Sequence, residues 1–326
     1  MKKIILFILL FSTEIFGQKT PHFEFIGVDS VFLLPGNIKT GIPDEVQFGG
    51  ISGLEYFANG FYLISDRSFK TDPSENSYLF KMDTMGIISG AFKFFNVKNA
   101  ESIRFDTLSR KIFYAFERDD STGVGYLNEN NQPNQLLSFS MNNSEFTADN
   151  RGIESLCFDG KYNLWFAFES SLNGMVPFFK LPFDYSKNNY NSDQKSNFLY
   201  PFDPKSCLNP DNTANANLGN GISEILPLDN DRLLVLERCF DGKQNTIKLF
   251  SATLPDPGNV FIKNELFDFS VNNQFLYGQK SLKPDNMEGM TWGENEADEK
   301  ILYLVSDDNF NTGRQRTLIL KLKFLI

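Results

Sequence analysis

Residues 49–68 read GGISGLEYFANGFYLISDRS, and this stretch decides the fold because its pattern recurs four more times along the chain. A small or apolar residue precedes Ser or Glu, and a short apolar strand follows. A turn rich in Asp, Asn and Gly then leads into a second apolar strand that ends in an acid. This is the pattern of a two-stranded hairpin. The other four copies occupy residues 99–119, 151–171, 220–240 and 286–310.

Two weaker strand patterns follow several of the hairpins. They span residues 77–83 and 86–95 in the first unit, 177–183 and 195–202 in the third, and 246–254 and 259–269 in the fourth. Four strands per unit, repeated at intervals of about 50 to 70 residues, are typical of a β-propeller. The sequence therefore predicts an all-β propeller with five visible repeats. A degenerate sixth blade in 190–220 or 268–285, or a β-sandwich, is the alternative.

The two ends of the chain are expected to close the ring. The fifth unit has only three strand patterns, and the last of them is residues 317–324. The stretch HFEFIGVDSVFLL, residues 22–34, supplies a fourth. Pairing of these two segments would remove the exposed strand edges that an open ring leaves.

The first residues of the chain have the pattern of an export signal. Lys2 and Lys3 precede an apolar run from Ile4 to Phe11, which is shorter than the roughly 20 residues that a membrane span needs. We therefore expect a signal peptide over residues 1–17 and one propeller domain over residues 18–326. The protein is then periplasmic or secreted.

The amino-acid composition excludes some classes of binding partner for this domain. The formal net charge of -10 argues against nucleic acid, whose phosphates need a basic surface, and no segment after the signal is apolar enough to span a membrane. The three cysteines are compatible with one disulfide in an oxidising compartment. Cys207 and Cys239 lie in predicted loops and are the better pair, whereas Cys157 lies in an apolar strand and is expected in the core.

Two positions of each repeat are expected to meet around one funnel. The first strand of a propeller blade lines the central axis, and the end of the second strand returns to the same face. The residues at the head of strand one are Ser52, Glu101, Glu154, Ser223 and Glu288, and the acids that close strand two are Asp66, Glu117, Glu169, Glu237 and Asp307. Eight carboxylates would therefore converge near the axis.

Such crowding is costly, because like charges and desolvation raise the pKa of each carboxyl group. A hard cation such as Ca²⁺, which takes 6–8 oxygen ligands, would relieve it. Arg67, Arg118 and Arg238 directly follow three of the strand-two acids and offer paired hydrogen-bond donors. The alternative is that each acid is structural, accepting backbone N–H groups or pairing with arginine.

The residue types that the chain contains limit the catalytic mechanisms that are possible. His22 is the single histidine, and the chain has neither a G-x-S-x-G elbow nor a cluster of His and Cys residues that would suit zinc. Any hydrolysis would therefore use carboxylates, metal-bound water and arginine.

The repeats resemble the phytase-like family, whose members are described as having the esterase-like activity of phytase, and three segments carry the most specific part of the resemblance. They are LLVLER (233–238), MEGMTWG (287–293) and LVSDDN (304–309), and the similarity runs through roughly residues 23–325. The resemblance implies a β-propeller, export, and hydrolysis of esters or phosphoesters. The family's motif acids map to Glu101, Glu154, Glu237, Glu288 and Asp307, with Arg67 and Arg238 beside them. Ser170 departs from the pattern, since three other repeats have arginine there.

These observations give one leading hypothesis, an exported hydrolase for small ester or phosphoester substrates. Ca²⁺ would be bound by Glu101, Glu154, Glu237, Glu288 and Asp307, with one of these acids as general base. The candidate catalytic residues are Glu154, Glu288, Arg67 and Arg238, of which the arginines would orient an anionic group and stabilise developing charge. A non-catalytic propeller that binds a ligand or a partner protein, and a lactonase-like enzyme, are the alternatives.

Overall fold

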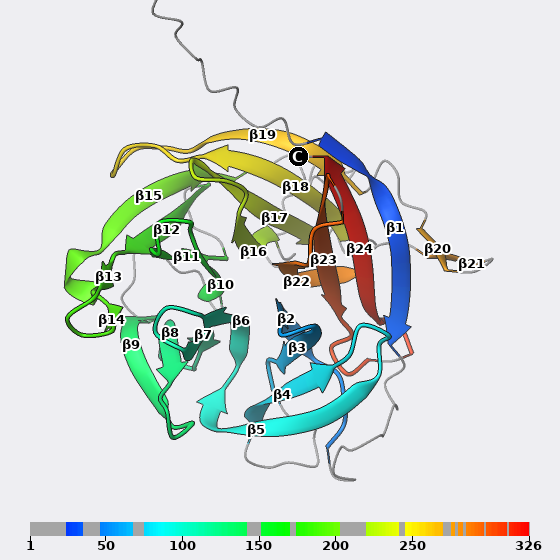
Figure 1. Ribbon diagram of the computed structural model, residues 1–326, viewed down its shortest axis with the longest axis horizontal. Coiled ribbons are helices and arrows are strands. Elements are labelled where there is room, and N and C mark those ends of the chain that lie inside the picture. The colour runs from blue at the N-terminus through cyan, green and yellow to red at the C-terminus, as the bar shows by residue number, and fades with distance from the viewer. Residues whose placement is uncertain are drawn as a thin grey trace, which may run out of the picture.

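Five four-stranded antiparallel sheets surround one axis, so the protein is a five-bladed β-propeller (Figure 1). The computed structural model describes residues 24–34, 46–67, 75–141, 151–169, 174–202, 220–240, 245–269, 275–277, 280–282, 285–296, 298–311 and 313–325. The all-β prediction is confirmed with five blades rather than six. The described parts of 190–220 and 268–285 contribute to blades 3 and 4 and to a small hairpin, not to a further blade.

Each blade runs from an inner strand at the axis to an outer strand at the rim. Blades 1 and 2 are β2 (Ile51–Phe57), β3 (Gly60–Ser65), β4 (Asn76–Met82) and β5 (Ile88–Lys98), then β6 (Ala100–Asp106), β7 (Lys111–Glu117), β8 (Ser121–Leu127) and β9 (Pro133–Ser140). Blades 3 and 4 are β10 (Ile153–Phe158), β11 (Leu164–Phe168), β12 (Met175–Leu181) and β15 (Ser196–Pro201), then β16 (Asn220–Pro227), β17 (Arg232–Phe240), β18 (Asn245–Thr253) and β19 (Ile262–Asp268).

Blade 5 is built from both ends of the chain. It contains β22 (Asn286–Trp292), β23 (Glu299–Asp307), β24 (Thr317–Leu325) and, as its outer strand, β1 (Glu24–Leu34). The antiparallel register places Val28 opposite Leu322 and Val31 opposite Leu320. The predicted closure of the ring is therefore confirmed. Two short hairpins lie outside the blades: β13 (Phe183–Asp184) with β14 (Asn189–Tyr190), and β20 (Phe275–Tyr277) with β21 (Lys280–Leu282).

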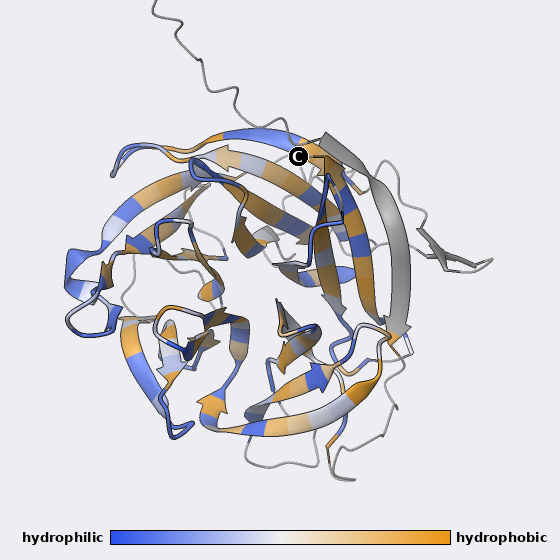
Figure 2. Cartoon of the chain, in the orientation of Figure 1, coloured by the Kyte–Doolittle hydropathy of each residue, from blue (hydrophilic) through white to orange (hydrophobic). Residues whose placement is uncertain are grey.

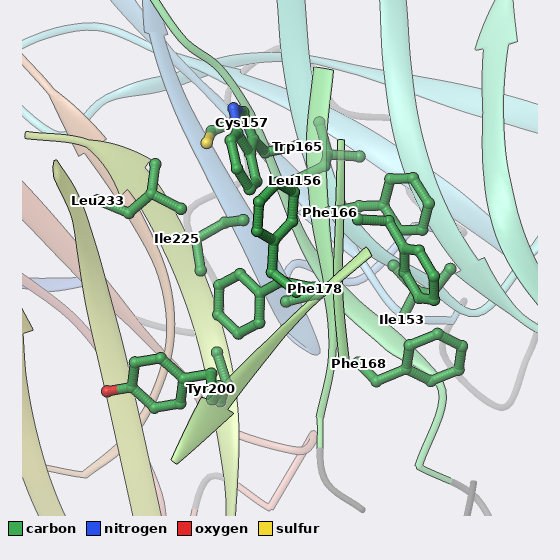
Figure 3. Close-up of a cluster of buried hydrophobic side chains, with 14 of the residues drawn as sticks. Ile153, Leu156, Cys157, Trp165, Phe166, Phe168, Phe178, Tyr200, Ile225 and Leu233 are labelled. Carbon is green, nitrogen blue, oxygen red and sulfur yellow. The ribbon is translucent and has the colours of Figure 1, made fainter. Parts of the chain in front are cut away.

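The blades hold together through aromatic side chains packed between adjacent sheets. Hydrophobic residues concentrate in the strands, whereas the connecting turns are mostly hydrophilic (Figure 2). Between blades 3 and 4, Phe261, which directly precedes β19, lies 5.0 Å from Phe178 and 6.3 Å from Trp165, measured between ring centroids. Figure 3 shows Phe178 and Tyr200 in this cluster. Phenylalanine, which accounts for 35 of the 326 residues, therefore serves packing between sheets.

The fold tests some of the sequence predictions about the cysteines and the chain ends. Cys239 is disulfide-bonded and Cys157 is a free, fully buried thiol. The predicted partner Cys207, together with His22, Ser170 and the signal peptide of residues 1–17, lies outside the described residues. Within the described ranges, no helix has the length and apolarity needed to cross a membrane.

Removal of residues 1–34 tests the closure. This deletion takes away β1 and exposes the edge of β24, which then offers unpaired backbone groups to other chains. We expect a lower Tm and association in size-exclusion chromatography. A chain that begins at residue 23 keeps β1 and is the control, expected to be monodisperse and to match the full chain in Tm. Equal behaviour of the two truncated chains would contradict the closure.

Candidate functional site

A β-bulge lies at the head of the inner strand in every blade. The pairing of inner and second strands skips one residue between Ile51 and Gly53, and the same shift recurs at the equivalent place in the other four blades. Bulges re-aim a side chain away from the regular alternation of a strand and are common beside active sites. The skipped residues are Ser52, Glu101, Glu154, Ser223 and Glu288, so the predicted first set of positions has a defined local geometry.

The second set of positions, at the end of the second strand of each blade, differs from the prediction in blade 4. Asp66, Glu117 and Glu169 each donate their backbone N–H to the residue two before the bulge, at 2.7–2.8 Å. In blade 4 the residue at this place is Arg238, which pairs with Gly221, whereas Glu237 pairs with Ile222. The equivalent set is therefore Asp66, Glu117, Glu169, Arg238 and Asp307.

Glu237 consequently points away from the other acids. Its Oε1 accepts hydrogen bonds from Tyr200 Oη at 2.7 Å and from Lys263 Nζ at 2.5 Å, between blades 3 and 4. Successive side chains of a strand face opposite sides, so an offset of one residue moves a side chain to the other face. The expectation that Glu237 joins the central carboxylates is not met, and Arg238 takes that place.

Seven carboxylates converge where the inner strands begin, and we call this set the acidic ring. It consists of Asp66, Glu101, Glu117, Glu154, Glu169, Glu288 and Asp307. Burial is the largest cause that raises the pKa of each member, and neighbouring acids of the ring add to the shift in most of them. The pKa is raised to about 6 for Asp66 and to about 7 for Glu117 and Glu288.

Arg238 neutralises one side of the acidic ring. Its Nη1 donates to Glu288 and, at 2.5 Å, to Asn286, and its Nη2 lies 3.5 Å from Glu169. Burial alone would lower the pKa of this guanidinium, but Glu288 and Glu169 hold it above its usual value. Arg151 also lies close enough to Glu169 to lower the pKa of its carboxyl group.

Compensation is weaker on the opposite side of the ring, where Arg238 attracts Glu154 from beyond ion-pair distance. One carboxylate oxygen from each of Glu101, Glu117 and Glu154 lies within 4.8 Å of the other two. Glu117 accepts a hydrogen bond from the backbone N–H of Gly152. Across the part of the chain that the structure describes, no cationic side chain contacts any of the three. Three hard oxygen donors at this spacing suit a divalent cation that prefers oxygen.

Two glycines make room for the acids of the preceding blade. A Cβ at Gly152 would overlap Thr122 and the carboxylate of Glu117, and one at Gly221 would overlap the side chain of Glu169. The glycines that precede the Ile in RGIES and NGISE are therefore required by close approach of a carboxylate to the backbone.

The arginines that follow the strand-two acids have different places. Arg67 is half exposed, and its Nη1 lies 3.5 Å from Asp66, so it marks the solvent-facing side of the ring. The guanidinium of Arg118 stacks 4.5 Å from the centre of the Phe116 ring. The predicted grouping of Arg238 with these two is wrong, because Arg238 lies one position earlier on its strand.

A second charged cluster fills the axis further along the inner strands. Arg104 of β6 places Nη2 at 2.8 Å from Glu224 of blade 4 and Nη1 at 3.7 Å from Glu55 of blade 1. The same guanidinium donates to the backbone carbonyls of Leu54 and Met290 at 3.1 Å. Arg104 therefore links blades 1, 2, 4 and 5 and closes the axis beneath the acidic ring.

The repeat pattern of the sequence does not predict this second cluster. Its signal is a charge inside an apolar inner strand, as in SIRF (102–105) and SEIL (223–226). A buried charge is expensive unless it is paired, so each such residue predicts a partner. The partner's identity depends on which blades face each other across the axis.

A sequence profile for the phytase-like family, described as esterase-like activity of phytase, matches residues 46–310. The chain belongs to the phytase-like family. The matched range covers the inner strands of all five blades and hence every member of the acidic ring. No curated protein is significantly similar to this phytase-like domain in sequence.

Solved structures with a similar fold include two enzymes. The endo-arabinase from Bacteroides thetaiotaomicron has a TM-score of 0.51 at 10% identity, over 88% of this chain and 97% of the other. The catalytic domain of an α-L-arabinofuranosidase from Coprinopsis cinerea also has a TM-score of 0.51, at 11% identity over 89% and 98%. At such identities the likeness shows the fold of the phytase-like domain alone.

Replacement of Arg104 tests the axial cluster. Arg104→Met leaves Glu224 buried without its cationic partner, which costs about 3–5 kcal/mol of the free energy of unfolding. Urea denaturation at pH 7 measures this loss. Lys98→Met, which breaks the exposed pair with Glu75, is the control and should cost about 1 kcal/mol or less. Equal effects of the two substitutions would contradict a stabilising role for the cluster.

The raised pKa values of the acidic ring predict an unusual pH dependence. The folded, metal-free protein holds protons that the unfolded chain has released, so its stability is greatest near pH 4–5 and falls as pH rises through about 6 to 7. Thermal unfolding in a chelator should give a lower Tm at pH 8 than at pH 5. Added Ca²⁺ should restore the Tm at pH 8 and change it less at pH 5. A Tm that rises with pH in chelator would contradict this assignment.

Proposed function

We propose that this phytase-like domain is a metal-assisted hydrolase of ester or phosphoester bonds that acts at the acidic ring. The observation that carries the proposal is the close group of Glu101, Glu117 and Glu154, which no described cationic side chain contacts, beside acids held by Arg238. Stability alone would not favour three carboxylates in one partly buried place. The description of the family supports the same reaction class.

The cation in this proposal is Ca²⁺ or a similar hard ion, bound by Glu101, Glu117 and Glu154. The donor set fits, because all three groups offer carboxylate oxygens within 4.8 Å of one another. Glu117 therefore replaces Glu237 in the ligand set expected from sequence. Glu288 and Asp307 belong to the same ring but lie outside this close group. When bound, such a cation polarises an ester or phosphoryl oxygen or activates water.

Glu288 is suited to transfer a proton. Its Oε1 accepts from Arg238 and from Asn286 Nδ2 at 2.6 Å, which fixes the orientation of the carboxyl group. Burial raises the pKa of Glu288 to about 7, against the lowering effect of Arg238. A carboxyl group with a pKa near neutrality can act as base and acid in turn. We therefore assign to Glu288 the exchange of a proton with the reacting water.

The arginines have separate roles in this proposal. Arg238 is a positioning residue, because its donors already engage Asn286, Glu288 and Glu169. Its charge also stabilises negative charge that develops beside Glu288. Arg67 is half exposed next to Asp66 and can orient an anionic part of the substrate from the solvent side. The axial cluster of Arg104 closes the other side, so substrate and product pass on the side of Arg67.

Two glutamine substitutions test the site. Glu154→Gln removes a charged cation ligand, so we expect weaker Ca²⁺ binding by calorimetry and a fall of kcat/KM by about 100-fold or more for 4-nitrophenyl acetate or 4-nitrophenyl phosphate. Glu237→Gln is the matched control. It should lower the Tm, because Lys263 loses its buried partner, and it should leave Ca²⁺ affinity and kcat/KM unchanged.

The outcomes separate the candidate functions. Full activity in the presence of a chelator, or full activity of Glu154→Gln, would remove the metal-assisted site. Ca²⁺ binding without turnover of any ester would instead support a non-catalytic binding propeller. Three ring acids are compatible with that second function, since Asp66, Glu117 and Asp307 each accept a backbone N–H group.

A further inference from the structure

Two of the five bulges carry serine where the other three carry glutamate. The hydroxyl groups of these serines differ in their hydrogen bonds. Ser52 Oγ donates to the carbonyl of Ala100 at 2.5 Å and lies 3.3 Å from that of Ile64. Ser223 is 1% exposed, and its Oγ has no hydrogen-bond partner among the residues that the structure describes. Ser52 therefore has a structural use that Ser223 lacks.

Ser223 lies on the side of the ring that Arg238 neutralises. It belongs to blade 4, whose neighbours carry Glu154 and Glu288 at the same bulge position. Gly221, two residues before Ser223, pairs with Arg238, and the backbone N–H of Ile222 donates to the carbonyl of Glu169 at 2.8 Å. The bulge that carries Ser223 thus lies between Glu169, Arg238 and Glu288 along the ring.

An unpartnered hydroxyl at this place calls for an explanation. Burial removes the hydrogen bonds that a hydroxyl makes with water, and this is unfavourable unless a new partner replaces them. Buried polar side chains in native proteins have a partner in the large majority of cases. Alanine at position 223 would avoid the cost, so the hydroxyl is expected to serve a bound molecule.

The hydrogen-bond donors and acceptors of the acidic ring indicate which kind of group the bound molecule carries. Ionised carboxylates only accept hydrogen bonds, whereas an ester or phosphoryl oxygen needs a donor. The Nη donors of Arg238 already engage Asn286, Glu288 and Glu169, and the hydroxyl of Ser52 is used by the backbone. Within the described part of the ring, the hydroxyl of Ser223 is a donor without a partner.

We propose that Ser223 Oγ donates a hydrogen bond to an oxygen of the substrate, bound at the acidic ring beside Arg238. The inference rests on the proposed hydrolase function and adds a substrate-contacting residue to it. Ser223 binds and orients the oxygen and forms no covalent bond to the substrate, since no described base lies within hydrogen-bond distance of its hydroxyl.

The chain offers a matched pair of variants for the test. Ser223→Ala and Ser52→Ala remove the same group at equivalent bulges. Each variant is compared with the full chain in Ca²⁺ by calorimetric binding of inorganic phosphate, by kcat/KM for 4-nitrophenyl acetate, and by Tm. Phosphate serves as the probe because it presents the same kind of oxygen without requiring turnover.

We expect opposite results from the two variants. Ser223→Ala should weaken phosphate binding and lower kcat/KM by about 10-fold to 100-fold, as loss of a hydrogen bond to a charged oxygen does. Its Tm should be unchanged or higher, because no hydrogen bond within the protein is lost. Ser52→Ala should lower the Tm by about 2–4 °C and leave phosphate binding and kcat/KM unchanged.

Three results would overturn the assignment. They are phosphate binding by Ser223→Ala equal to that of the full chain, a loss of Tm in Ser223→Ala as large as that in Ser52→Ala, and absence of phosphate binding by the full chain. Phosphate binding that depends on Ser223, without turnover of any ester, would keep the assignment and reject the hydrolase function. The two proposals can therefore fail separately.

Discussion

Closure of five blades around one axis forces five strand heads into a small volume, and the chain places a bulged polar residue at each of them. Three of these residues are glutamates, and four more acids come from the ends of the second strands. Repulsion and desolvation act together on this set, as the raised pKa values show. The remaining features of the site are responses to that crowding.

Two layers of charged side chains lie along the axis: an upper layer, which is the acidic ring, and a lower layer around Arg104. Positive charge neutralises the acids of the two layers to different degrees. In the lower layer, Arg104 meets Glu224, Glu55 and backbone carbonyls of other blades, and this network ties the inner strands together. In the upper layer, Arg238 forms its ion pairs with Glu169 and Glu288. The deficit of positive charge falls on Glu101, Glu117 and Glu154. Chemistry is therefore expected in the upper layer and stability in the lower one.

Propeller architecture by itself does not select a reaction. The two solved enzymes with a similar fold are named for arabinose-containing substrates, whereas the family to which this chain belongs is described by the esterase-like activity of phytase. One fold supports different chemistries because the side chains at the axis differ while the sheets stay the same. The proposed function therefore depends on the carboxylates, Arg238 and Ser223, and not on the likeness of the sheets.

The sequence alone predicted five repeats, the four-stranded blades and the closure of the ring from hairpin patterns and the pairing of edges, and the structure decided between five blades and six. It also placed all seven ring acids at two positions of the repeat, and added Glu237, which faces elsewhere. Tertiary structure decided the rest. Glu237 and Arg238 are adjacent in LLVLER, and only the pairing with the bulged inner strand shows which side chain faces the axis. Arg104 finds partners on three other blades, and Ser223 differs from Ser52 only in its surroundings. Such contacts join residues far apart in the chain, and a local pattern contains no information about them.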